Sequence, residues 1–425
     1  MLQVNYISAN RDFVIEGMKK RNFSPEQLAW IDEVIELDEN RKSTQFSSDS
    51  AKAEMNKLSK EIGALYKSGQ REAAEEKKAI VSSHKAEIQE LQEKLQQIEA
   101  DLEEKLLLLP NVPHPSVPAG STDEDNEVYR AWEKELPNLG EDALPHWELA
   151  EKYQLFDLKL GVKITGSGFP LYRGKGAKLQ RALISFFLDE ASKAGYEEVI
   201  PPHLVNEATA RATGQLPDKE GQMYYVTKDD LYLIPTAEVP VTNIYRDVLL
   251  EEKDFPIQMT AYTPCFRREA GSYGAHVRGL NRVHQFDKVE IVRIEHPERS
   301  YQALEEMLTH VGGILDQLEL PYRILRLCGG DLGFTSALTF DFEVYSAAQK
   351  RWLEVSSVSN FETYQSNRLQ VRFKQGKKKV LAHTLNGSAL ALARVVAAIL
   401  ENNQTHEGIV VPKVLREYTR FDIIQ

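Results

Sequence analysis

The stretch QMTAYTPCFRRE, residues 258–269, passes from a strand-like run into a cluster of charged side chains. A second strand-like run follows after a loop that contains glycine. We therefore expect a β-hairpin that presents Arg267, Glu269, Arg282 and Phe286 at its base. Guanidinium groups suit bidentate contact with phosphate, and the face of a phenylalanine can stack on a purine. Taken singly, each also has an ordinary explanation as a surface arginine or a core phenylalanine.

The sequence around this hairpin alternates between strand-like and helical patterns. Contiguous strands linked by short turns favour an antiparallel sheet flanked by helices, which is an α+β fold. Strand-like runs lie at 223–227, 231–235, 258–265, 284–294, 322–327, 339–346, 351–358 and 370–373, and helical stretches at 175–194, 300–318 and 389–402. Neither a P-loop nor a dinucleotide-binding glycine motif occurs, so side chains must hold any nucleotide.

Two acidic residues occur within the predicted strands. Glu354 is followed by Ser356 and Ser357, and Glu290 ends the sequence DKVE. A carboxylate that points inward from a strand is costly unless it is paired or bound to a metal. A carboxylate beside a hydroxyl can bind Mg²⁺ on nucleotide phosphates. The alternative is that both carboxylates face solvent.

The segment Asn386–Arg394 begins with residues typical of a helix cap and continues into an apolar helix. Arg394 is the only charged residue between Ala389 and Leu400. A surface arginine whose stem lies along apolar groups is the simple explanation. The alternative is a buried arginine held for an anion, which with a second arginine and a carboxylate would form a triphosphate site.

The first hundred residues carry two heptad patterns separated by a short turn. One pattern runs from Trp30 to Leu65 and the other from Val81 to Leu109, with the turn KSGQ at residues 67–70. So short a turn makes the two helices antiparallel neighbours. An arm of roughly 40 residues is about 60 Å long, so we expect it to project into solvent.

Charge is unevenly distributed along this predicted arm. Residues 52–85 contain eight Lys or Arg against five Asp or Glu, whereas residues 24–40 contain six acids and no base. The outer half therefore either contacts a polyanion or is an ordinary solvated coiled coil.

Prolines at positions 110, 113, 115 and 118 end the second helix, and the acidic sequence STDEDNE follows. We therefore predict an N-terminal domain at 1–110, a proline-rich linker at 111–125 and a larger domain at 126–425.

Composition limits the classes of function. The 425 residues have a formal net charge of −12, which excludes a uniformly basic nucleic-acid binder and leaves room for local basic patches. The two cysteines, Cys265 and Cys328, lie far apart, so we expect no zinc site and no disulfide, as suits a reducing cytosol. We also expect no secretory signal and no membrane span.

Together these motifs resemble those of class II aminoacyl-tRNA synthetases, and specifically the bacterial-type seryl-tRNA synthetases. Gly195–Pro202 resembles motif 1 of that class, Phe266–Glu269 with Arg282–Phe286 resembles motif 2, and Asn386–Arg394 resembles motif 3. Thr236–Glu238 resembles the serine-contacting loop. The resemblance covers essentially the whole chain, and the coiled-coil arm separates this family from other class II enzymes.

The resemblance implies a six-stranded antiparallel catalytic sheet in a cytoplasmic homodimer. It implies that L-serine and ATP form seryl-adenylate with release of pyrophosphate. The seryl group then passes to the 3′ end of tRNA(Ser), or of tRNA(Sec) where that is present. The arm would bind the tRNA by its shape and backbone.

The resemblance also implies a role for each matching residue. Arg267 would bind the α-phosphate, Arg394 the γ-phosphate, and Glu354 with Ser357 the Mg²⁺ that accompanies ATP, so that Arg267, Arg394 and Glu354 carry the catalysis. Phe286 would stack on adenine. The rest of the ATP site would be Arg268, Glu269, Val283, Val355 and Ser356, and the serine site would be Thr236, Ala237, Glu238, Glu290, Asn386 and Ser388. We expect Glu290 to contact the serine hydroxyl and Glu238 the α-amino group.

Four places depart from the usual family pattern. Ser272–Arg278 lacks a common Lys/Arg-Asp-Thr run, Val358 stands for a common Cys, Leu338 for a common Lys, and Asn367 for the first of two Arg. None of these removes an inferred ATP or serine ligand. Two rival interpretations are a related ligase that activates an amino acid for a carrier protein or another tRNA, and a non-catalytic coiled-coil scaffold.

Overall fold

The chain divides into two compact units, Met1–Pro110 and Asn111–Gln425. The structure is a computed structural model, and it describes residues 1–218, 221–269 and 278–425. Ser272–Val277, which form most of the unusual segment of motif 2, lie outside the described residues.

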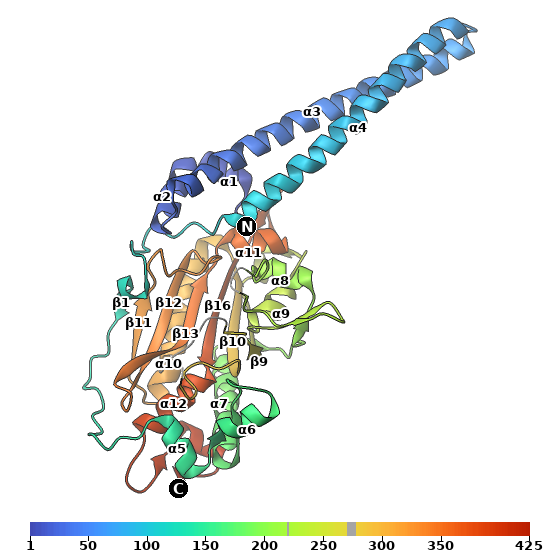
Figure 1. Ribbon diagram of the computed structural model, residues 1–425. Coiled ribbons are helices and arrows are strands. Elements are labelled where there is room, and N and C mark those ends of the chain that lie inside the picture. The colour runs from blue at the N-terminus through green and yellow to red at the C-terminus, as the bar shows by residue number, and fades with distance from the viewer. Residues whose placement is uncertain (219–220, 270–277) are drawn as a thin grey trace. The chain divides into compact units, whose positions relative to one another are not determined.

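The first unit is a long helical hairpin preceded by two short helices (Figure 1). α1 (Val4–Ala9) and α2 (Arg11–Lys20) pack on α3 (Pro25–Lys67), which runs antiparallel to α4 (Arg71–Leu108). Ser24 begins α3 with a capping box, in which its hydroxyl accepts from the Gln27 N–H and the Gln27 side chain accepts from the Ser24 N–H. The predicted hairpin is confirmed.

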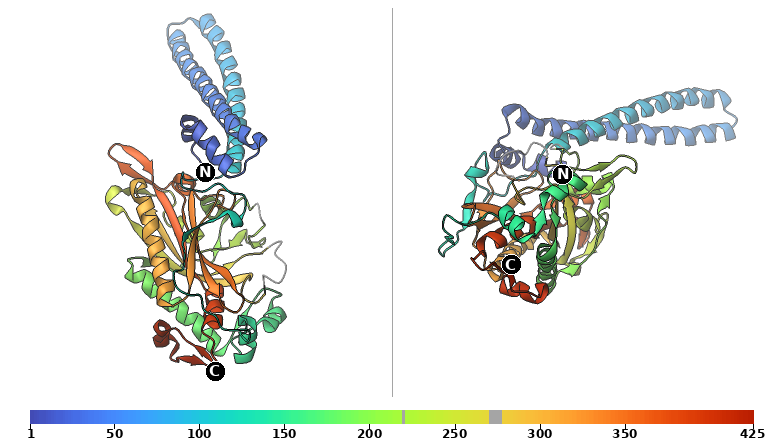
Figure 2. Two further views of the ribbon diagram at one scale, coloured as in Figure 1. Left: turned by 90° about the vertical axis from the view of Figure 1, so that its left-hand side faces the viewer. Right: turned by 60° about the horizontal axis from the view of Figure 1, so that its bottom comes forward.

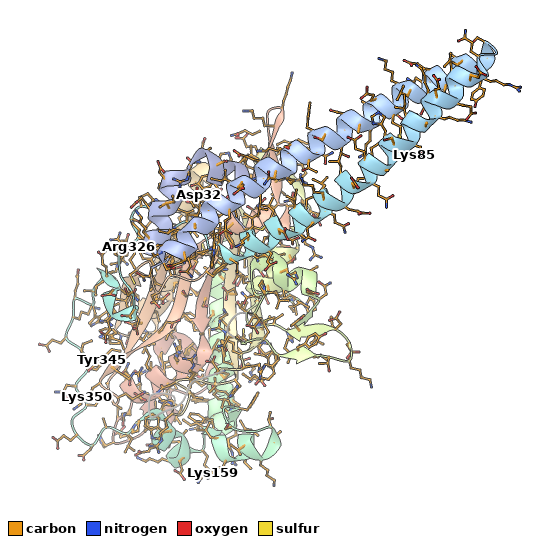
Figure 3. The ribbon with its side chains drawn as sticks, turned by 45° about the horizontal axis from the view of Figure 1, so that its top comes forward. Asp32, Lys85, Lys159, Arg326, Tyr345 and Lys350 are labelled. Atoms are coloured by element: carbon orange, nitrogen blue, oxygen red, sulfur yellow. The ribbon has the colours of Figure 1, made fainter. Side chains whose placement is uncertain are left out.

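Ion pairs fix the register of the two long helices. Glu33 of α3 pairs with Lys105 of α4 at 2.5 Å, and farther out Glu61 pairs with Lys77. Asp32, near the start of α3, pairs with Arg11 of α2 at 2.6 Å, whereas Lys85 lies far along the arm on α4 (Figure 3). Ile31, Val34, Ile88, Ile98 and Leu102 are buried, and so are the polar side chains of Asp38, Thr44 and Ser48 in the middle of α3.

The second unit is built on an eight-stranded sheet whose central part is antiparallel. Its order is β1 (Glu127–Arg130), β11 (Tyr322–Arg326), β12 (Leu338–Ser346), β13 (Arg351–Asn360), β16 (His383–Ala391), β10 (Gln285–Glu295), β9 (Ile257–Phe266) and β4 (Glu197–Glu198). The strands β11 to β9 form the predicted six-stranded antiparallel sheet. β1 and β4, the latter parallel to β9, widen it beyond the prediction, because strands of four and two exposed residues carry no alternating pattern.

Three helices cover one face of this sheet (Figure 2). α7 (Gly174–Lys193) packs on β9 and β10, α10 (Ser300–Gln317) on β13 and β16, and α12 (Leu392–Asn402) on β10, β12 and β13. The main hydrophobic core lies between the sheet and these helices. In α12 every residue from Val395 to Glu401 is buried, which explains why its sequence reads as an unbroken apolar run.

The start of α12 differs from the prediction. Asn386, Gly387 and Ser388 were expected to cap a helix, but they lie inside β16, and the helix begins only at Leu392. β16 is an inner strand: Asn386 pairs with Val292 of β10 on one side and with Ser359 of β13 on the other. Pairing on both sides satisfies the backbone groups of these residues, so their helix-capping preference is overridden.

Smaller elements surround the sheet. Among the described residues, four small sheets are formed by β5 (Leu204–Val205), β7 (Leu231–Leu233) and β6 (Tyr225–Val226), by β15 (Lys378–Leu381), β14 (Arg372–Gln375) and β8 (Leu249–Glu251), by β2 (Phe156–Asp157) and β3 (Leu171–Tyr172), and by β17 (Ile409–Val410) and β18 (Ile423–Ile424). Further helices are α5 (His146–Tyr153), α6 (Leu158–Ile164), α8 (Glu207–Thr213), α9 (Glu238–Asn243), α11 (Thr363–Leu369) and α13 (Arg416–Thr419).

Residues 111–125, expected to form a linker, begin the second unit. The Asn111 N–H donates to the Phe334 carbonyl at 2.9 Å, and the His114 N–H donates to the Ala337 carbonyl at 2.8 Å. Dense proline ends the helix as predicted, but the chain after it packs on this unit. Over the ranges that the structure describes, no helix is long and apolar enough to cross a membrane.

Candidate active site

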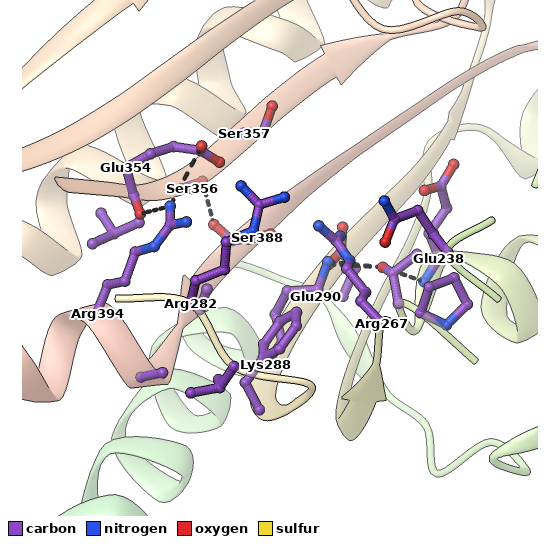
Figure 4. A pocket seen from close by; sticks show the side chains of 18 of the residues that line it. Glu238, Arg267, Arg282, Lys288, Glu290, Glu354, Ser356, Ser357, Ser388 and Arg394 are labelled. Atoms are coloured by element: carbon purple, nitrogen blue, oxygen red, sulfur yellow. Dashed lines mark hydrogen bonds and ion pairs between the residues drawn. The ribbon is translucent and has the colours of Figure 1, made fainter. Parts of the chain in front are cut away.

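A cavity of about 540 Å³ opens over β9, β10, β13 and β16 in the second unit (Figure 4). Alternation along β10 sends Phe286, Lys288 and Glu290 toward it, whereas Val289 and Ile291, which alternate with Lys288 and Glu290, belong to the core. The strands that carry the core on one face thus carry polar side chains on the other.

Most of the predicted site residues line this one cavity. They are Thr236, Glu238, Arg267, Glu269, Val283, Phe286, Glu290, Glu354, Val355, Ser356, Ser357, Asn386, Ser388 and Arg394. Ala237 and Arg268 do not line it. The Ala237 side chain is buried in a small apolar cluster, and Arg268 is exposed, since it alternates with Arg267 along the extended chain.

Arginine and aromatic side chains meet at one part of the cavity. The Arg267 guanidinium lies 5.5 Å from the centre of the Phe286 ring, in cation–π geometry. Arg282 pairs with Glu269 through its Nε. The fork of Arg267 and the face of Phe286 therefore lie together, as phosphate and purine recognition in one nucleotide requires.

Arg394 is held in place by backbone oxygens. Its Nε donates to the Asn281 carbonyl at 2.8 Å and its Nη1 to the Glu354 carbonyl at 2.7 Å, while the Glu354 carboxylate lies 3.4 Å from Nη1. The Arg394 side chain is 30% exposed, so it is neither a free surface arginine nor fully buried. It is a fixed cation at the cavity wall.

The part of the cavity away from Arg394 and Glu354 is compact and polar (Figure 4). Lys288 Nζ lies 2.6 Å from Glu290 Oε2 and donates to Thr236 Oγ1 at 2.8 Å. Glu238 Oε1 accepts from Gln365 Nε2 at 2.5 Å, and the Gln365 oxygen accepts from the Thr384 hydroxyl at 2.7 Å. Two carboxylates, one ammonium and a hydroxyl are thus gathered in a space suited to a small zwitterion.

Glu238 is the perturbed acid of this group. Burial, and then the charge of nearby Glu290, raise the pKa of Glu238 to about 7, although the bond from Gln365 opposes the shift. A carboxyl group of this kind gains from the approach of a cation such as an α-ammonium group.

Glu354 and Ser357 lie close to a third oxygen donor. The Ser357 hydroxyl donates to Asp341 Oδ1 at 2.6 Å, and burial followed by the charge of Glu354 raises the pKa of Asp341 well above its usual value. The Glu354 side chain is half exposed. Within the described ranges, no group of three or more His, Cys, Asp or Glu is arranged to hold a metal on its own.

Lys288, Asp341 and Gln365 are among the residues in or near the cavity that the sequence analysis did not predict. Lys288 shares a strand face with Phe286 and Glu290, so its spacing of two residues from each could have predicted that it faces the same cavity. Asp341 alternates with Phe340 and Phe342 in β12, which also marked it as facing away from the core. Gln365 lies on α11, far away in the sequence, and no pattern linked it to Glu238.

Two models of known protein families match this chain. Residues 224–403 match the tRNA synthetase class II core domain (G, H, P, S and T), and residues 1–113 match the seryl-tRNA synthetase N-terminal domain. The chain is 50% identical to a serine–tRNA ligase of Salinibacter ruber over 424 residues, covering 99% of this chain and 98% of the relative. It is 46% identical to a serine–tRNA ligase of Chlorobaculum parvum over 432 residues, covering 100% of both.

A solved structure agrees with these matches. The seryl-tRNA synthetase from Pyrococcus horikoshii, crystallised with ATP, has a TM-score of 0.93 and 33% identity, covering 100% of this chain and 99% of that one. The antiparallel sheet and its arginine-lined cavity therefore define a class II aminoacyl-tRNA synthetase. Within that class, the full-length identity decides the family: the chain belongs to the seryl-tRNA synthetases. The resemblance predicted from the sequence is confirmed, and the chain is an aminoacyl-tRNA ligase.

Proposed function

We propose that this chain activates L-serine with ATP and transfers the seryl group to the 3′ end of tRNA(Ser), and to tRNA(Sec) where it is present. One observation carries the proposal. A single cavity joins a part lined by Arg267, Phe286 and Arg394 to a part lined by Thr236, Glu238 and Glu290. The first suits a nucleotide triphosphate and the second a small hydroxylated amino acid, so the two reactants lie side by side.

In the first step, a carboxylate oxygen of serine attacks the α-phosphorus of ATP, and the bond to pyrophosphate breaks. Arg267 stabilises the charge that develops on the α-phosphate, and the ring of Phe286, which lies beside Arg267, stacks on adenine. Arg394, already fixed by two carbonyl groups, binds the γ-phosphate. In the second step, the tRNA hydroxyl attacks the acyl carbon and AMP leaves.

Serine is selected by paired hydrogen-bonding groups. Glu290, held by Lys288, accepts from the serine hydroxyl, and Glu238 pairs with the α-ammonium group. Alanine would leave Glu290 without that donor, which a buried carboxylate site penalises strongly. Asn386 and Ser388 complete the wall of this part of the cavity.

The residues around Glu354 fit Mg²⁺ carried by ATP. Glu354 and Ser357 offer the hard oxygen donors that Mg²⁺ prefers, while phosphate oxygens and water would complete its coordination. Burial, and then the charge of Glu354, raise the pKa of nearby Asp341. When bound, the ion would neutralise phosphate charge.

The arm of the first unit is the proposed tRNA-binding element. The ion pairs between α3 and α4 keep it extended, and its outer half carries the basic excess. Contacts of that half with the phosphate backbone would add affinity without reading bases.

A homodimer and a cytoplasmic location are further parts of the proposal. Around motif 1, the apolar side chains of Ile200, Leu204 and Ile244 are 86%, 42% and 52% exposed, a patch that a second copy would cover. Cys265 and Cys328 are both free and buried, which suits a reducing compartment.

ATP–pyrophosphate exchange measured with each amino acid in turn tests the activation step. We expect exchange with serine and little with alanine, threonine or glycine. Exchange with another amino acid would support a related ligase, and absence of exchange with every amino acid would support a scaffold.

A further inference from the structure

A buried network joins α5 and α12 to the segment Arg278–Val283, which ends motif 2. His146, the first residue of α5, and Glu401 of α12 are both 0% exposed, and His146 Nδ1 lies 2.6 Å from Glu401 Oε1. The His146 backbone N–H donates to the same oxygen at 2.9 Å. Neither residue lines the cavity, so the chemistry proposed above does not use them.

The other side of the His146 ring holds the backbone of that segment. The Leu280 N–H donates to His146 Nε2 at 2.8 Å. Because Nε2 accepts, the ring proton lies on Nδ1 and is donated to Glu401, which fixes both the tautomer and the orientation of the imidazole. A Cβ at Gly279 would lie 2.2 Å from Nε2, so the close approach depends on glycine there, whose φ is +71°.

A second branch runs from Glu401 to an arginine of the cavity. Gln349 Nε2 donates to Glu401 Oε1 at 2.8 Å, and the Gln349 oxygen accepts from Asn281 Nδ2 at 2.8 Å. The Asn281 carbonyl in turn accepts from Arg394 Nε at 2.8 Å. The two branches thus meet in neighbouring residues, Leu280 and Asn281.

Glu401 has the charge that this arrangement needs. Burial acts to raise the pKa of Glu401, but hydrogen bonds from His146 and Ser346 outweigh it and leave the pKa lowered. An ionised acceptor gives hydrogen bonds about twice as strong as a neutral one. The outer end of the segment is held separately, where the Arg278 guanidinium lies 4.7 Å from the Trp147 ring centre.

We infer that His146 and Glu401 are positioning residues for the ATP part of the cavity. They fix the backbone of Leu280 and Asn281, and through it the placement of Arg282, Val283 and Arg394. A buried His–Glu pair is often only structural, but here both branches end on residues that line the cavity. The inference rests on the proposed function, which assigns this part of the cavity to ATP.

Two variants of His146 separate positioning from packing. In His146→Gln the longer side chain places an amide near the position of Nε2, where its oxygen can accept from the Leu280 N–H. In His146→Asn the amide reaches only the position of Nδ1, so it can donate to Glu401 but leaves the Leu280 N–H without an acceptor. Both variants lose the ring, so any loss of packing is shared. His310→Asn, on α10 and outside this network, is the matched control.

The readouts are the KM values for ATP and for serine in exchange, calorimetric binding of ATP alone, and the thermal unfolding midpoint. We expect His146→Asn to weaken ATP binding on the order of tenfold, with little change in KM for serine, and His146→Gln to restore most of it. Equal changes in both KM values, or ATP binding that is the same in both variants, would overturn the inference. No serine-dependent exchange by the unsubstituted chain would overturn the proposed function, while ATP binding would still decide between the two variants.

Discussion

Lys288 Nζ lies 2.6 Å from Glu290 Oε2, and the two side chains are 6% and 3% exposed. Their spacing of two along β10 places both on the cavity face. The Lys288 ammonium group offsets part of the cost of burying this carboxylate. Glu290, paired with Lys288, is therefore a hydrogen-bond acceptor prepared for a neutral hydroxyl, whereas Glu238, whose pKa is raised to about 7, gains from the approach of an ammonium group.

Glu290→Ala should reduce the preference for serine over alanine. The variant removes the acceptor whose loss of a partner penalises alanine, so we expect the ratio of kcat/KM values in exchange to fall at least about tenfold. Glu251→Ala, a surface carboxylate on β8 paired with Lys374, is the control and should keep the ratio. Unchanged discrimination in Glu290→Ala would move the hydroxyl contact to another residue.

The KM for serine should depend on pH through Glu238. Its pKa of about 7 lies above the ordinary value, so the free site binds a proton more tightly than an ordinary carboxylate does and loses its charge as pH falls below 7. A protonated Glu238 cannot pair with an ammonium group. We expect the KM for serine to rise as pH falls through 7, by up to about tenfold per pH unit, while the KM for ATP stays constant.

Glu238→Gln is the test of that pH dependence. It should have a raised KM for serine that no longer changes across pH 6 to 8, roughly one unit to either side of the raised pKa. The same pH profile in Glu238→Gln as in the parent would assign the titration to another group.

Glu354→Ala should shift the requirement for Mg²⁺. Loss of one oxygen donor should raise the Mg²⁺ concentration for half-maximal exchange by roughly ten- to a hundredfold, and excess Mg²⁺ should restore part of the rate. A titration of exchange rate against Mg²⁺ at fixed ATP measures the shift. Glu343→Ala, on β12 and paired with Arg323 at 2.6 Å, tests whether any nearby carboxylate has the same effect. An Mg²⁺ requirement that moves equally in both variants would argue against Glu354 as a specific ligand.

Removal of residues 42–94 should separate the two steps of the reaction. The pairs Glu33–Lys105 and Glu61–Lys77 set a register in which residue 41 lies nearly opposite residue 95, so a short Gly-Ser link can close the shortened hairpin. We expect exchange to stay within about twofold of the parent, since the cavity lies wholly in the second unit, while tRNA charging falls by at least about a hundredfold. Charging at the parental rate would remove the arm from tRNA recognition.

The helices and the central strands could be predicted because their patterns are local. The heptads from Trp30 and from Val81 repeat over many turns, and alternation marks β9, β10, β12 and β13 in the sequence itself. The start of α12 could not be predicted in this way. Asn386–Ser388 prefer helix caps locally, and only pairing with β10 and β13 makes them a strand.

Much of the candidate site could also be predicted, but through family motifs rather than geometry. Arg267, Phe286, Glu354 and Arg394 each had an ordinary explanation until their order along the chain was compared with a family. Contacts between distant segments, such as Gln365 with Glu238 or His146 with Glu401, could not be predicted from the sequence. These pairs lie 127 and 255 residues apart, so no periodicity connects them.

Aminoacylation of purified tRNA(Ser) with labelled serine tests the central claim most directly. Run beside it, the same tRNA without its long variable arm is the matched control. The account predicts that the full tRNA is charged with serine in the presence of ATP and Mg²⁺ and that the shortened tRNA is charged far more slowly. Failure to charge tRNA(Ser) with serine, or charging it with a different amino acid, would contradict the account.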